Sequence, residues 1–360
     1  MEQRKEVLKK LSDLGLNVLK MIEEGRNPYI EIPIRSLSNI IWDERRKMLK
    51  LGEKKLKRYF FNVGTAKKFM QTFLVAGFCY DIVKENIHAS IRDMFYNLKR
   101  TLGDSNENTF DEQSESNPII VDLETALNVL REQLHLIADR KGVVAGKVKI
   151  RDRGDLIDWS KLGSGGWSIP STVEDIEFVD VKADYVIVVE KNAGFERLHE
   201  DKFWKKHNCI LIGTGGQAAR GTRRLINRLN TEFDLPVYVL TDNDAYGFYI
   251  YSVIKSGSMA LAHVSEQLAT PDAKFVGLTS SDIDDYKLQN FTIKATEMDL
   301  KRAKELLQYP WFKAKEWRRE IKLMIKRKRK AEIEALSSRG LKFLSETYLP
   351  EKIESGDFLP

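Results

Sequence analysis

Four short apolar runs in the second half of the chain constrain its fold most strongly. Helical segments separate them, and they are YVIVVE (residues 185–190), CILIGTGG (209–216), PVYVLTD (236–242) and KFVGLTS (274–280). Runs this apolar are typical of strands buried on both faces, and their alternation with helices indicates a mostly parallel sheet. We therefore expect an α/β domain over residues 183–360, with further helical elements toward its C-terminal end.

Acidic side chains follow two of these runs. Glu190 ends the first run, and Asp242 and Asp244 follow the third. Because the carboxyl ends of parallel strands meet at one edge of a sheet, the three acids should lie together despite their separation in sequence. Carboxylate oxygens suit Mg²⁺, which takes one or two of them and leaves room for phosphate oxygens. The pattern favours a magnesium site, and the alternative is that these acids cap helices or pair with Lys191.

A glycine-rich turn follows the second run. Its sequence GTGGQA (residues 213–218) fits the loose fingerprint of dinucleotide-binding proteins, but it stands on the second strand of the domain and not on the first. The next helix carries Arg220, Arg224 and Arg228 one turn apart, and we expect this row to contact DNA phosphates. A dinucleotide-binding α/β protein remains the alternative at this point.

The first half of the chain has a different pattern. Residues 1–64 read as an N-terminal extension of a helix and short strands, among them Arg58–Val63, and we expect it to contact a partner. Residues 65–170 read as three helices and a hairpin, which together make a winged-helix (CAP-like) DNA-binding domain. The expected helices are Lys67–Val83, Ile87–Lys99 and Leu123–Ile137, and the expected hairpin joins residues 143–150 and 162–170. The acidic stretch Gly103–Asn117 reads as a solvated loop without an assigned role.

The second of these helices contains a candidate nucleophile. In IRDMFYNLKR (residues 91–100), Arg92, Tyr96 and Arg100 stand four residues apart, so a helix would place them on one face. A free tyrosine has a pKa near 10 and is a poor nucleophile at neutral pH, but a neighbouring guanidinium favours the phenolate and can clamp a phosphate. The alternatives are that Tyr96 packs in the core and that Asp93 forms a capping box with Ser90.

Charge and hydropathy agree with a partner that is a polyanion. Lys and Arg number 59 against 53 Asp and Glu, an excess of 6, and the helix-forming segment Lys313–Lys330 is strongly basic. No stretch approaches the roughly 18 apolar residues of a membrane span. We expect a cytoplasmic, nucleoid-associated protein that binds double-stranded DNA and no membrane.

Three motifs in this order carry a resemblance to a known family. RDMFY (92–96), VVEKNAGFERL (188–198) and LTDNDAYG (240–247) resemble the A subunits of type IIB DNA topoisomerases, the topoisomerase VI group in its archaeal form. They are similar also to the related meiotic double-strand-break transesterase. The resemblance covers nearly the whole chain and implies a winged-helix domain that carries the catalytic tyrosine, followed by a toprim domain.

The resemblance also implies roles and partners. Tyr96 would become linked to the DNA 5′ phosphate, Arg92 and Asp93 would assist it, and Glu190 and Asp242 would hold Mg²⁺ with Asp244 completing the cluster. Two A subunits would form a homodimer in which the tyrosine of one meets the toprim pocket of the other. Two B subunits with a GHKL-type ATPase would complete an A2B2 heterotetramer, and ATP would bind to B and not to this chain. The alternatives are a toprim nuclease or primase, or a DNA-binding protein without catalysis.

Overall fold

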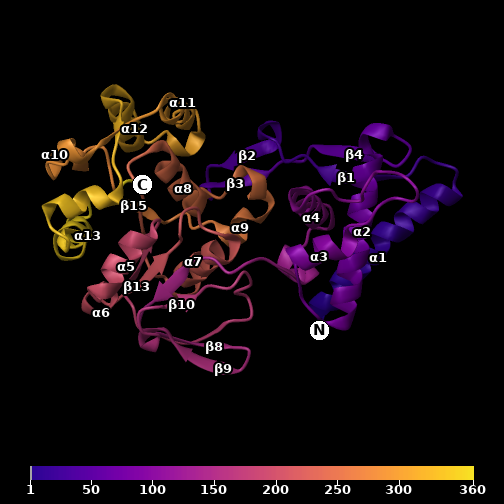
Figure 1. Cartoon of the computed structure of the whole chain (residues 1–360), viewed down its shortest axis with the longest axis horizontal. Helices are drawn as coiled ribbons and strands as arrows, with labels where there is room; N and C mark the ends of the chain where they lie inside the picture. Colours follow the sequence, from indigo (N-terminus) through magenta and orange to yellow (C-terminus); the bar gives the residue numbers. More distant parts are fainter. Residues whose placement is uncertain (1) are drawn as a thin grey trace. The chain divides into compact units, whose positions relative to one another are not determined.

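The computed structural model describes residues 2–360, and the chain divides into two compact units (Figure 1). The first unit comprises residues 1–41, 50–139 and 259–264, and the second comprises residues 42–49, 140–258 and 265–360. Two short strands, β2 (Ile40–Asp43) and β3 (Met48–Leu51), pair with each other where the chain passes between the units. Among residues 2–360, no helix combines the length and the apolar character needed to cross a membrane.

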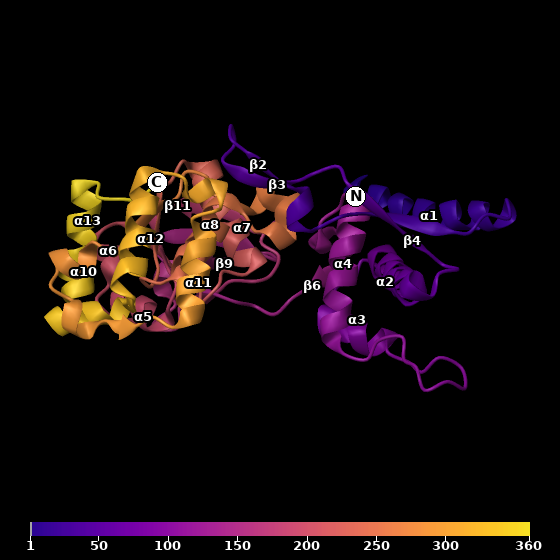
Figure 2. The same cartoon turned by 90° about the horizontal axis from the view of Figure 1, so that it is seen from above.

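The first unit is a helical bundle with short strands. Its elements are α1 (Glu2–Glu23), β1 (Tyr29–Pro33), β4 (Lys55–Tyr59), α2 (Val63–Glu85), β5 (Ala89–Ser90), α3 (Ile91–Leu98), α4 (Gln113–Leu127) and β6 (Leu136–Ile137). Apolar side chains of the four helices form one core, with Val75 and Cys79 of α2 fully buried at its centre. In Figure 2 the loop after α3 projects away from the helices of this unit.

The prediction of a helix over Lys67–Val83 is confirmed, and the helix is longer at both ends. The side chain of Asn62 caps its first turn, and Asn86 ends it in the left-handed conformation at φ 60°. The predicted second helix is shorter than expected, because Ala89 and Ser90 pair with Leu136 and Ile137 in a short parallel bridge.

The third predicted helix is misplaced. The helix occupies Gln113–Leu127, and Leu136–Ile137, predicted as its end, is a strand. Its buried residues Ile119, Ile120 and Leu123 continue the apolar face toward the N-terminus, into a stretch whose polar composition suggested a loop. The strand predicted at Arg58–Val63 is also displaced, since β4 ends at Tyr59 and α2 begins at Val63.

The N-terminal extension is fastened to α4 by a buried carboxylate. Asp122 accepts hydrogen bonds from Arg35 Nη2 at 2.7 Å and from Arg58 Nη2 at 2.5 Å. Arg58 stands on β4, while Arg35 follows β1. Most of the extension therefore packs within the first unit and not as a separate body, while its residues 42–49 belong to the second unit.

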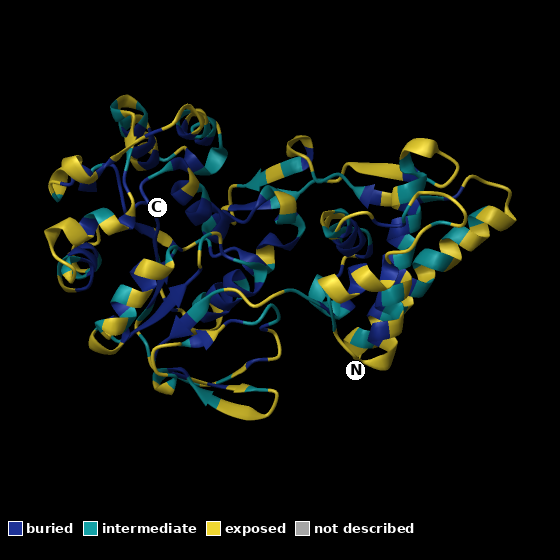
Figure 3. Cartoon of the chain, viewed as in Figure 1, coloured by how far each residue is buried: buried dark blue, intermediate teal, exposed yellow. Residues whose placement is uncertain are grey.

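The second unit contains a six-stranded sheet in the order β10-β7-β13-β12-β14-β15. The strands are β10 (Trp167–Ser168), β7 (Val143–Ala145), β13 (Cys209–Gly213), β12 (Tyr185–Val189), β14 (Val237–Leu240) and β15 (Lys274–Gly277). The last four are the four apolar runs, and they pair in parallel. They are the most deeply buried part of the unit (Figure 3). The predicted mostly parallel sheet is confirmed.

Helices cover both faces of this sheet, as the alternation of strand side chains requires. Val186 and Val188 point to one face and Ile187 and Val189 to the other. The first face packs on α7 (Arg220–Phe233), α8 (Ala245–Ser256), α11 (Glu297–Leu306) and α12 (Lys315–Arg327). The second face packs on α5 (Asn192–Glu200), α6 (Phe203–Lys206), α10 (Asp282–Asp285) and α13 (Leu349–Ser355). The short helix α9 (Ser265–Leu268) packs against α7.

The strands predicted as the wing of the DNA-binding domain belong to the second unit. β7 does pair antiparallel with β10, but β7 also pairs with β13 and so extends the large sheet. Between them, β8 (Val148–Asp152) forms a separate three-stranded sheet with β9 (Asp155–Asp158) and β11 (Glu177–Val181). The assignment as a wing is therefore wrong, and the units divide after Asp139 rather than at residue 170. In the remaining pair, β16 (Ile293–Lys294) precedes α11 and β17 (Arg329–Lys330) follows α12, so their antiparallel pairing brings the start of α11 to the end of α12.

Candidate active site

The acidic residues after β12 and β14 lie at one edge of the sheet. These strands are neighbours in register, with Val189 opposite Leu240. The next residues along each strand therefore meet, and the Asp242 N–H donates to Glu190 Oε2 at 3.2 Å. Glu190 is half-buried and Asp242 is buried. The structure brings together Glu190 and Asp242, two of the three acids that the strand pattern placed on a shared edge.

The turn after β14 fixes the positions of Asp242 and Asp244. Asp244 is the N-cap of α8, where its Oδ1 accepts from Gly247 N at 2.7 Å. A side chain at Gly247 would stand 2.3 Å from the Asp242 carbonyl oxygen, so the tight turn requires glycine there. Asn243 between the two acids is fully buried and exchanges backbone hydrogen bonds with Ala331 in both directions. Helix capping, which the sequence left open for these acids, is thus one real role of Asp244.

The glycine-rich turn after β13 holds the end of β12. Gly216 N donates to the Glu190 carbonyl oxygen at 2.7 Å, and Thr214 N donates to Val189 O at 2.9 Å. Gly215 and Gly216 have φ of 60° and 93°, in the left-handed region that glycine adopts without strain. This turn therefore positions the backbone of Glu190.

Burial and like charge shape the electrostatics of this edge. Burial, with the charges of Asp242 and Asp244 adding to it, raises the pKa of Glu190 to about 7. Burial also raises the pKa of Asp242, against hydrogen bonds from Ile333 N and Lys191 that favour its ionised form. Carboxylates that resist ionisation in this way gain from a cation beside them.

A second acidic segment, which the sequence analysis missed, lies against the same edge. Ile333 N donates to Asp242 Oδ1 at 2.8 Å, and its neighbours Glu332 and Glu334 each form an ion pair with Lys191 Nζ at 3.1 Å. Lys191 also pairs with Asp242 Oδ2 at 3.0 Å. Asp242 and Ile333 are 91 positions apart in the sequence (333 − 242 = 91). The spacing gave no signal for this contact, and only the alternation of apolar and acidic residues in AEIE (331–334) hinted that one side of this segment is buried.

The donor set fits a magnesium ion held by few protein ligands. Among residues 2–360, no three His, Cys, Asp or Glu side chains are placed to grip one metal together. Mg²⁺ does not need such a cage, because it keeps several waters and binds through one or two carboxylates together with substrate phosphates. Glu190 and Asp242 could supply those carboxylates, while Asp244 is committed in part to its helix cap.

Tyr96 stands on the solvent side of α3. Its side chain is 67% exposed, so the alternative that it packs in the core is wrong. Its ring contacts the buried Phe95 edge-on at 5.1 Å between centroids. Asp93 forms the capping box with Ser90, accepting from Ser90 Oγ at 2.7 Å, and this fixes the first turn of the helix that presents the tyrosine. Asp93 therefore has a structural role.

The predicted alignment of Arg100 with Arg92 and Tyr96 is wrong. Helix α3 ends at Leu98, and Lys99 is extended at ψ 117°, so Arg100 lies beyond the helix. Its backbone instead pairs with Thr109 at the base of the following loop. Arg92 is exposed one turn before Tyr96, and that part of the alignment stands.

Two of the three arginines predicted to contact DNA are held within the second unit. Arg224 Nε pairs with Glu174 at 2.9 Å. Arg228 pairs with Glu232 and donates to the Ile176 carbonyl oxygen at 2.9 Å, and its residue is only 9% exposed. Both guanidinium groups fasten α7 to the segment before β11. Contact of this row with DNA phosphates stays a prediction, and it would require these guanidinium groups to leave partners that they have within the chain.

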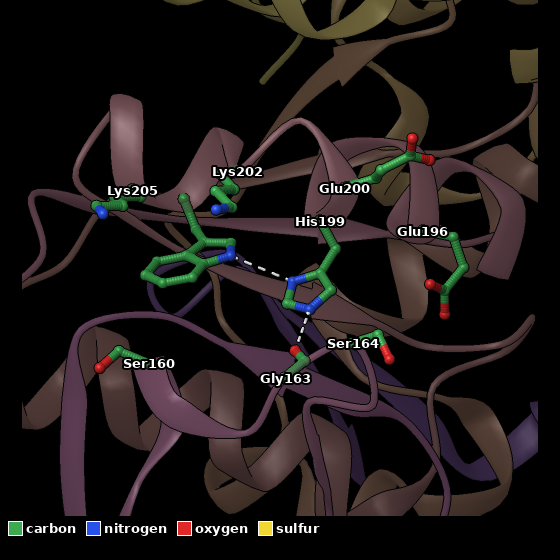
Figure 4. A pocket seen from close by; sticks show the side chains of 9 residues that line it. Ser160, Gly163, Ser164, Glu196, His199, Glu200, Lys202 and Lys205 are labelled. Atoms are coloured by element: carbon green, nitrogen blue, oxygen red, sulfur yellow. Dashed lines mark hydrogen bonds between the residues drawn. The ribbon is translucent and has the colours of Figure 1, made fainter.

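A hollow of about 550 Å³ lies elsewhere on the second unit, between α5–α6 and the loop after β9 (Figure 4). His199 stands at its centre, accepting from Trp204 Nε1 at 3.2 Å and contacting the Gly163 carbonyl oxygen at 2.8 Å. Neither Glu190 nor Asp242 lines this hollow. The acidic edge is therefore separate from this hollow.

Comparisons with known proteins agree with this division of the chain. Residues 185–353 match the toprim-domain family of topoisomerase 6 A subunits and Spo11, residues 67–136 match "Type IIB DNA topoisomerase", and residues 141–182 match "All-beta domain in DNA topoisomerase VI alpha subunit". The A subunit of type 2 DNA topoisomerase 6 from Pyrococcus abyssi is 49% identical over 364 residues, which cover 98% of this chain and 95% of that protein. The chain belongs to the A subunits of type IIB DNA topoisomerases.

The family extends across distant organisms. The A subunit of type 2 DNA topoisomerase 6 from Saccharolobus shibatae is 46% identical, covering 99% of this chain and 97% of that protein. The A3 subunit of DNA topoisomerase 6 from rice is 35% identical, covering 98% of this chain and 78% of that protein. In this type IIB topoisomerase chain the toprim match contains Glu190, Asp242 and the segment 331–334, and the match from 67 to 136 contains Tyr96. The all-β match covers the strands misassigned as a wing.

Proposed function

We propose that this chain is the DNA-cleaving subunit of an ATP-dependent type IIB topoisomerase and that it breaks both strands of a duplex by transesterification at Tyr96. The observation that carries the proposal is an exposed tyrosine on a capped helix together with an acidic sheet edge, in a chain of this family. The double-strand break is religated after strand passage, which relaxes supercoils.

The chemistry follows from phosphoryl transfer. The Tyr96 Oη attacks phosphorus in line and forms a 5′-phosphotyrosyl bond as the bond to the 3′ oxygen breaks; the phenol proton passes to solvent and the 3′ oxygen takes one up. Arg92, one turn away on the same exposed face, would bind the phosphate and offset its charge. Religation reverses these steps, and because the phosphotyrosine conserves the ester bond it consumes no ATP.

Glu190 and Asp242 would hold Mg²⁺, with Asp244 in support. When bound, the ion would neutralise charge on the phosphate oxygens as the ester is exchanged. Glu190 faces this position from the end of β12 and Asp242 faces it from the end of β14, and the glycine turn at Gly215 and Gly216 keeps the first strand end in place.

The division of the chain into two units supports the proposed assembly of A and B subunits. Tyr96 and the acidic edge belong to different units, which suits a homodimer in which each active site takes its tyrosine from one chain and its acids from the other. A GHKL-type B subunit would bind and hydrolyse ATP in an A2B2 assembly, with the N-terminal extension as a candidate contact. Double-stranded DNA would meet Arg100, Arg220 and the exposed lysines and arginines of α12. The protein would act beside the nucleoid in the cytoplasm.

The deciding experiment traps the covalent intermediate. Duplex DNA is incubated with this chain, its B subunit, ATP and Mg²⁺, the reaction is stopped with denaturant, and the residue bonded to DNA is mapped by mass spectrometry. Wild type should form an adduct at Tyr96, Tyr96→Phe should bind DNA but form none, and the matched control Tyr80→Phe in α2 should behave as wild type. Cleavage without any adduct would point to a nuclease, and an undiminished adduct in Tyr96→Phe would remove Tyr96 from the reaction.

A further inference from the structure

Lys191 is the centre of an ion cluster at the acidic edge. Its Nζ lies 3.0 Å from Asp242 Oδ2, 3.1 Å from Glu332 Oε2 and 3.1 Å from Glu334 Oε2. Three carboxylates from two distant segments thus converge on one ammonium group. That group is next in sequence to Glu190, on the residue that caps α5.

The two glutamates are held beside Lys191 by contacts that do not involve it. Ala331 exchanges backbone hydrogen bonds with Asn243, and Ile333 is buried at 2% exposure with its N–H on Asp242 Oδ1. Glu332 is the extended residue before the 3-10 helix Ile333–Arg339, Glu334 lies in the first turn of that helix, and both side chains reach Lys191. Their side chains are 51% and 43% exposed, so they can follow the lysine, whereas Asp242 is 10% exposed and fixed.

The Asp242 oxygen that Lys191 occupies is one that a divalent cation would need. Asp242 has two carboxylate oxygens, and the N–H of Ile333 already binds the other. The three carboxylates and one ammonium carry a net charge of −2 (−3 + 1), which one Mg²⁺ would balance. An ammonium group that left Asp242 would keep two acceptors in Glu332 and Glu334.

We propose that Lys191 is a built-in counter-ion that occupies the Asp242 oxygen until a divalent cation arrives, and that Glu332 and Glu334 then retain the displaced ammonium group. This inference rests on the magnesium site of the proposed function. Lys191, Glu332 and Glu334 are positioning residues that set how readily the cation enters. They make no contact with the reacting phosphate.

The test is a thermodynamic cycle on Mg²⁺ binding by the full-length chain, measured by titration calorimetry at pH 8. Glu332→Gln with Glu334→Gln should weaken Mg²⁺ binding about tenfold, the lower range for groups that act through a metal ligand, because Lys191 then has no partner except Asp242. Lys191→Met should bind Mg²⁺ at least as tightly as wild type. In the Lys191→Met background the two glutamine substitutions should change the affinity less than about twofold, because the competing ammonium is gone.

Controls separate this inference from a structural role and from the proposed function. Glu196→Gln, an exposed charge change on α5, should leave Mg²⁺ binding unchanged. The inference would be overturned if the two glutamine substitutions lowered the Mg²⁺ affinity equally with and without Lys191, because the glutamates would then act on the cation directly through their charge. It would also be overturned if they caused no loss of affinity in either background. If Glu190→Gln and Asp242→Asn also leave Mg²⁺ binding unaltered, the magnesium site itself fails. If they abolish binding while the cycle shows no coupling, only the counter-ion inference fails.

Discussion

Glu190→Gln should stabilise the metal-free protein at alkaline pH while it removes a carboxylate that we propose as a ligand of Mg²⁺. The pKa of Glu190 is raised to about 7, first by burial and then by the charges of Asp242 and Asp244. Ionising this carboxylate therefore opposes folding. Glutamine has nearly the same shape, can still accept the hydrogen bond from Asp242 N, and does not ionise.

The direction and size of the effect follow from proton linkage. Because the folded-state pKa lies above the ordinary value of 4.5, Glu190 favours the folded state below pH 4.5, and this contribution is lost as the pH rises through 7. At about 1.4 kcal/mol per pKa unit, the loss is roughly 3 kcal/mol at pH 8 and under about 1 kcal/mol at pH 5. Glu190→Gln should exceed wild type in stability by about these amounts.

Tryptophan fluorescence is the suitable assay. All six tryptophans, at positions 42, 159, 167, 204, 311 and 317, belong to the second unit, so their emission reports unfolding of the unit that contains the acidic edge. Urea unfolding would be followed in EDTA at pH 5 and pH 8. The exposed Glu196→Gln serves as the matched control and should show no pH-dependent difference from wild type.

Magnesium provides an internal check on the same sample. A ligand that binds only the folded state at about 100 times its Kd stabilises it by about 2.7 kcal/mol, so saturating Mg²⁺ at pH 8 should stabilise wild type and have little effect on Glu190→Gln. The reasoning would be refuted if Glu190→Gln were no more stable than wild type at pH 8. It would also be refuted by an equal gain at pH 5 and pH 8, because the effect would then not come from ionisation.

Three further substitutions test other parts of the structure. Arg228→Ala should destabilise the second unit by about 2–4 kcal/mol in urea unfolding, because it leaves buried carbonyl groups without a donor, and should leave the salt dependence of DNA binding unchanged; a flatter salt dependence would restore this arginine to the DNA surface. Gly247→Ala should lower both stability and Mg²⁺ affinity, since the new methyl group meets the Asp242 carbonyl oxygen at 2.3 Å. A variant whose melting temperature and Mg²⁺ affinity by calorimetry equal those of wild type would contradict this. Asp93→Ala should cost about 1 kcal/mol in circular-dichroism melts through loss of the capping box, whereas Asp93→Asn should cost less, and equal melts for both variants would speak against the cap.

Sequence periodicity predicted the elements whose surroundings are uniform along their length. The four parallel strands are apolar on nearly every residue because both faces of their sheet are covered, and the exception is the exposed Lys274 at the start of β15. Sequence periodicity failed for α4, where the polar first turns suggested a loop, and for the strands that were assigned to a wing. An antiparallel pair of strands has the same sequence pattern whichever sheet it extends, and here β7 also pairs with β13 of the large sheet.

The arginines of α7 show how much local signal was present. Glu232 stands four residues after Arg228, so a helix would pair them, and this alone indicated that Arg228 was not free for DNA. The Arg224 partner, Glu174, lies 50 residues earlier and outside any local pattern. The arginine spacing was read correctly as one helix face, but only the packing decided that this face is covered.

The sequence by itself determined which acids share an edge, because Glu190 and Asp242 each end a strand and parallel strands end on the same side. It also determined the cap that begins the tyrosine helix, since Ser90 and Asp93 interact within one turn. Only the tertiary structure decided that residues 331–334 close on this edge and place two glutamates around Lys191. That arrangement depends on Asn243 and Ile333 finding partners nearly a hundred residues away, and such long-range contacts are fixed by the packing of whole elements and not by the spacing of residues within one.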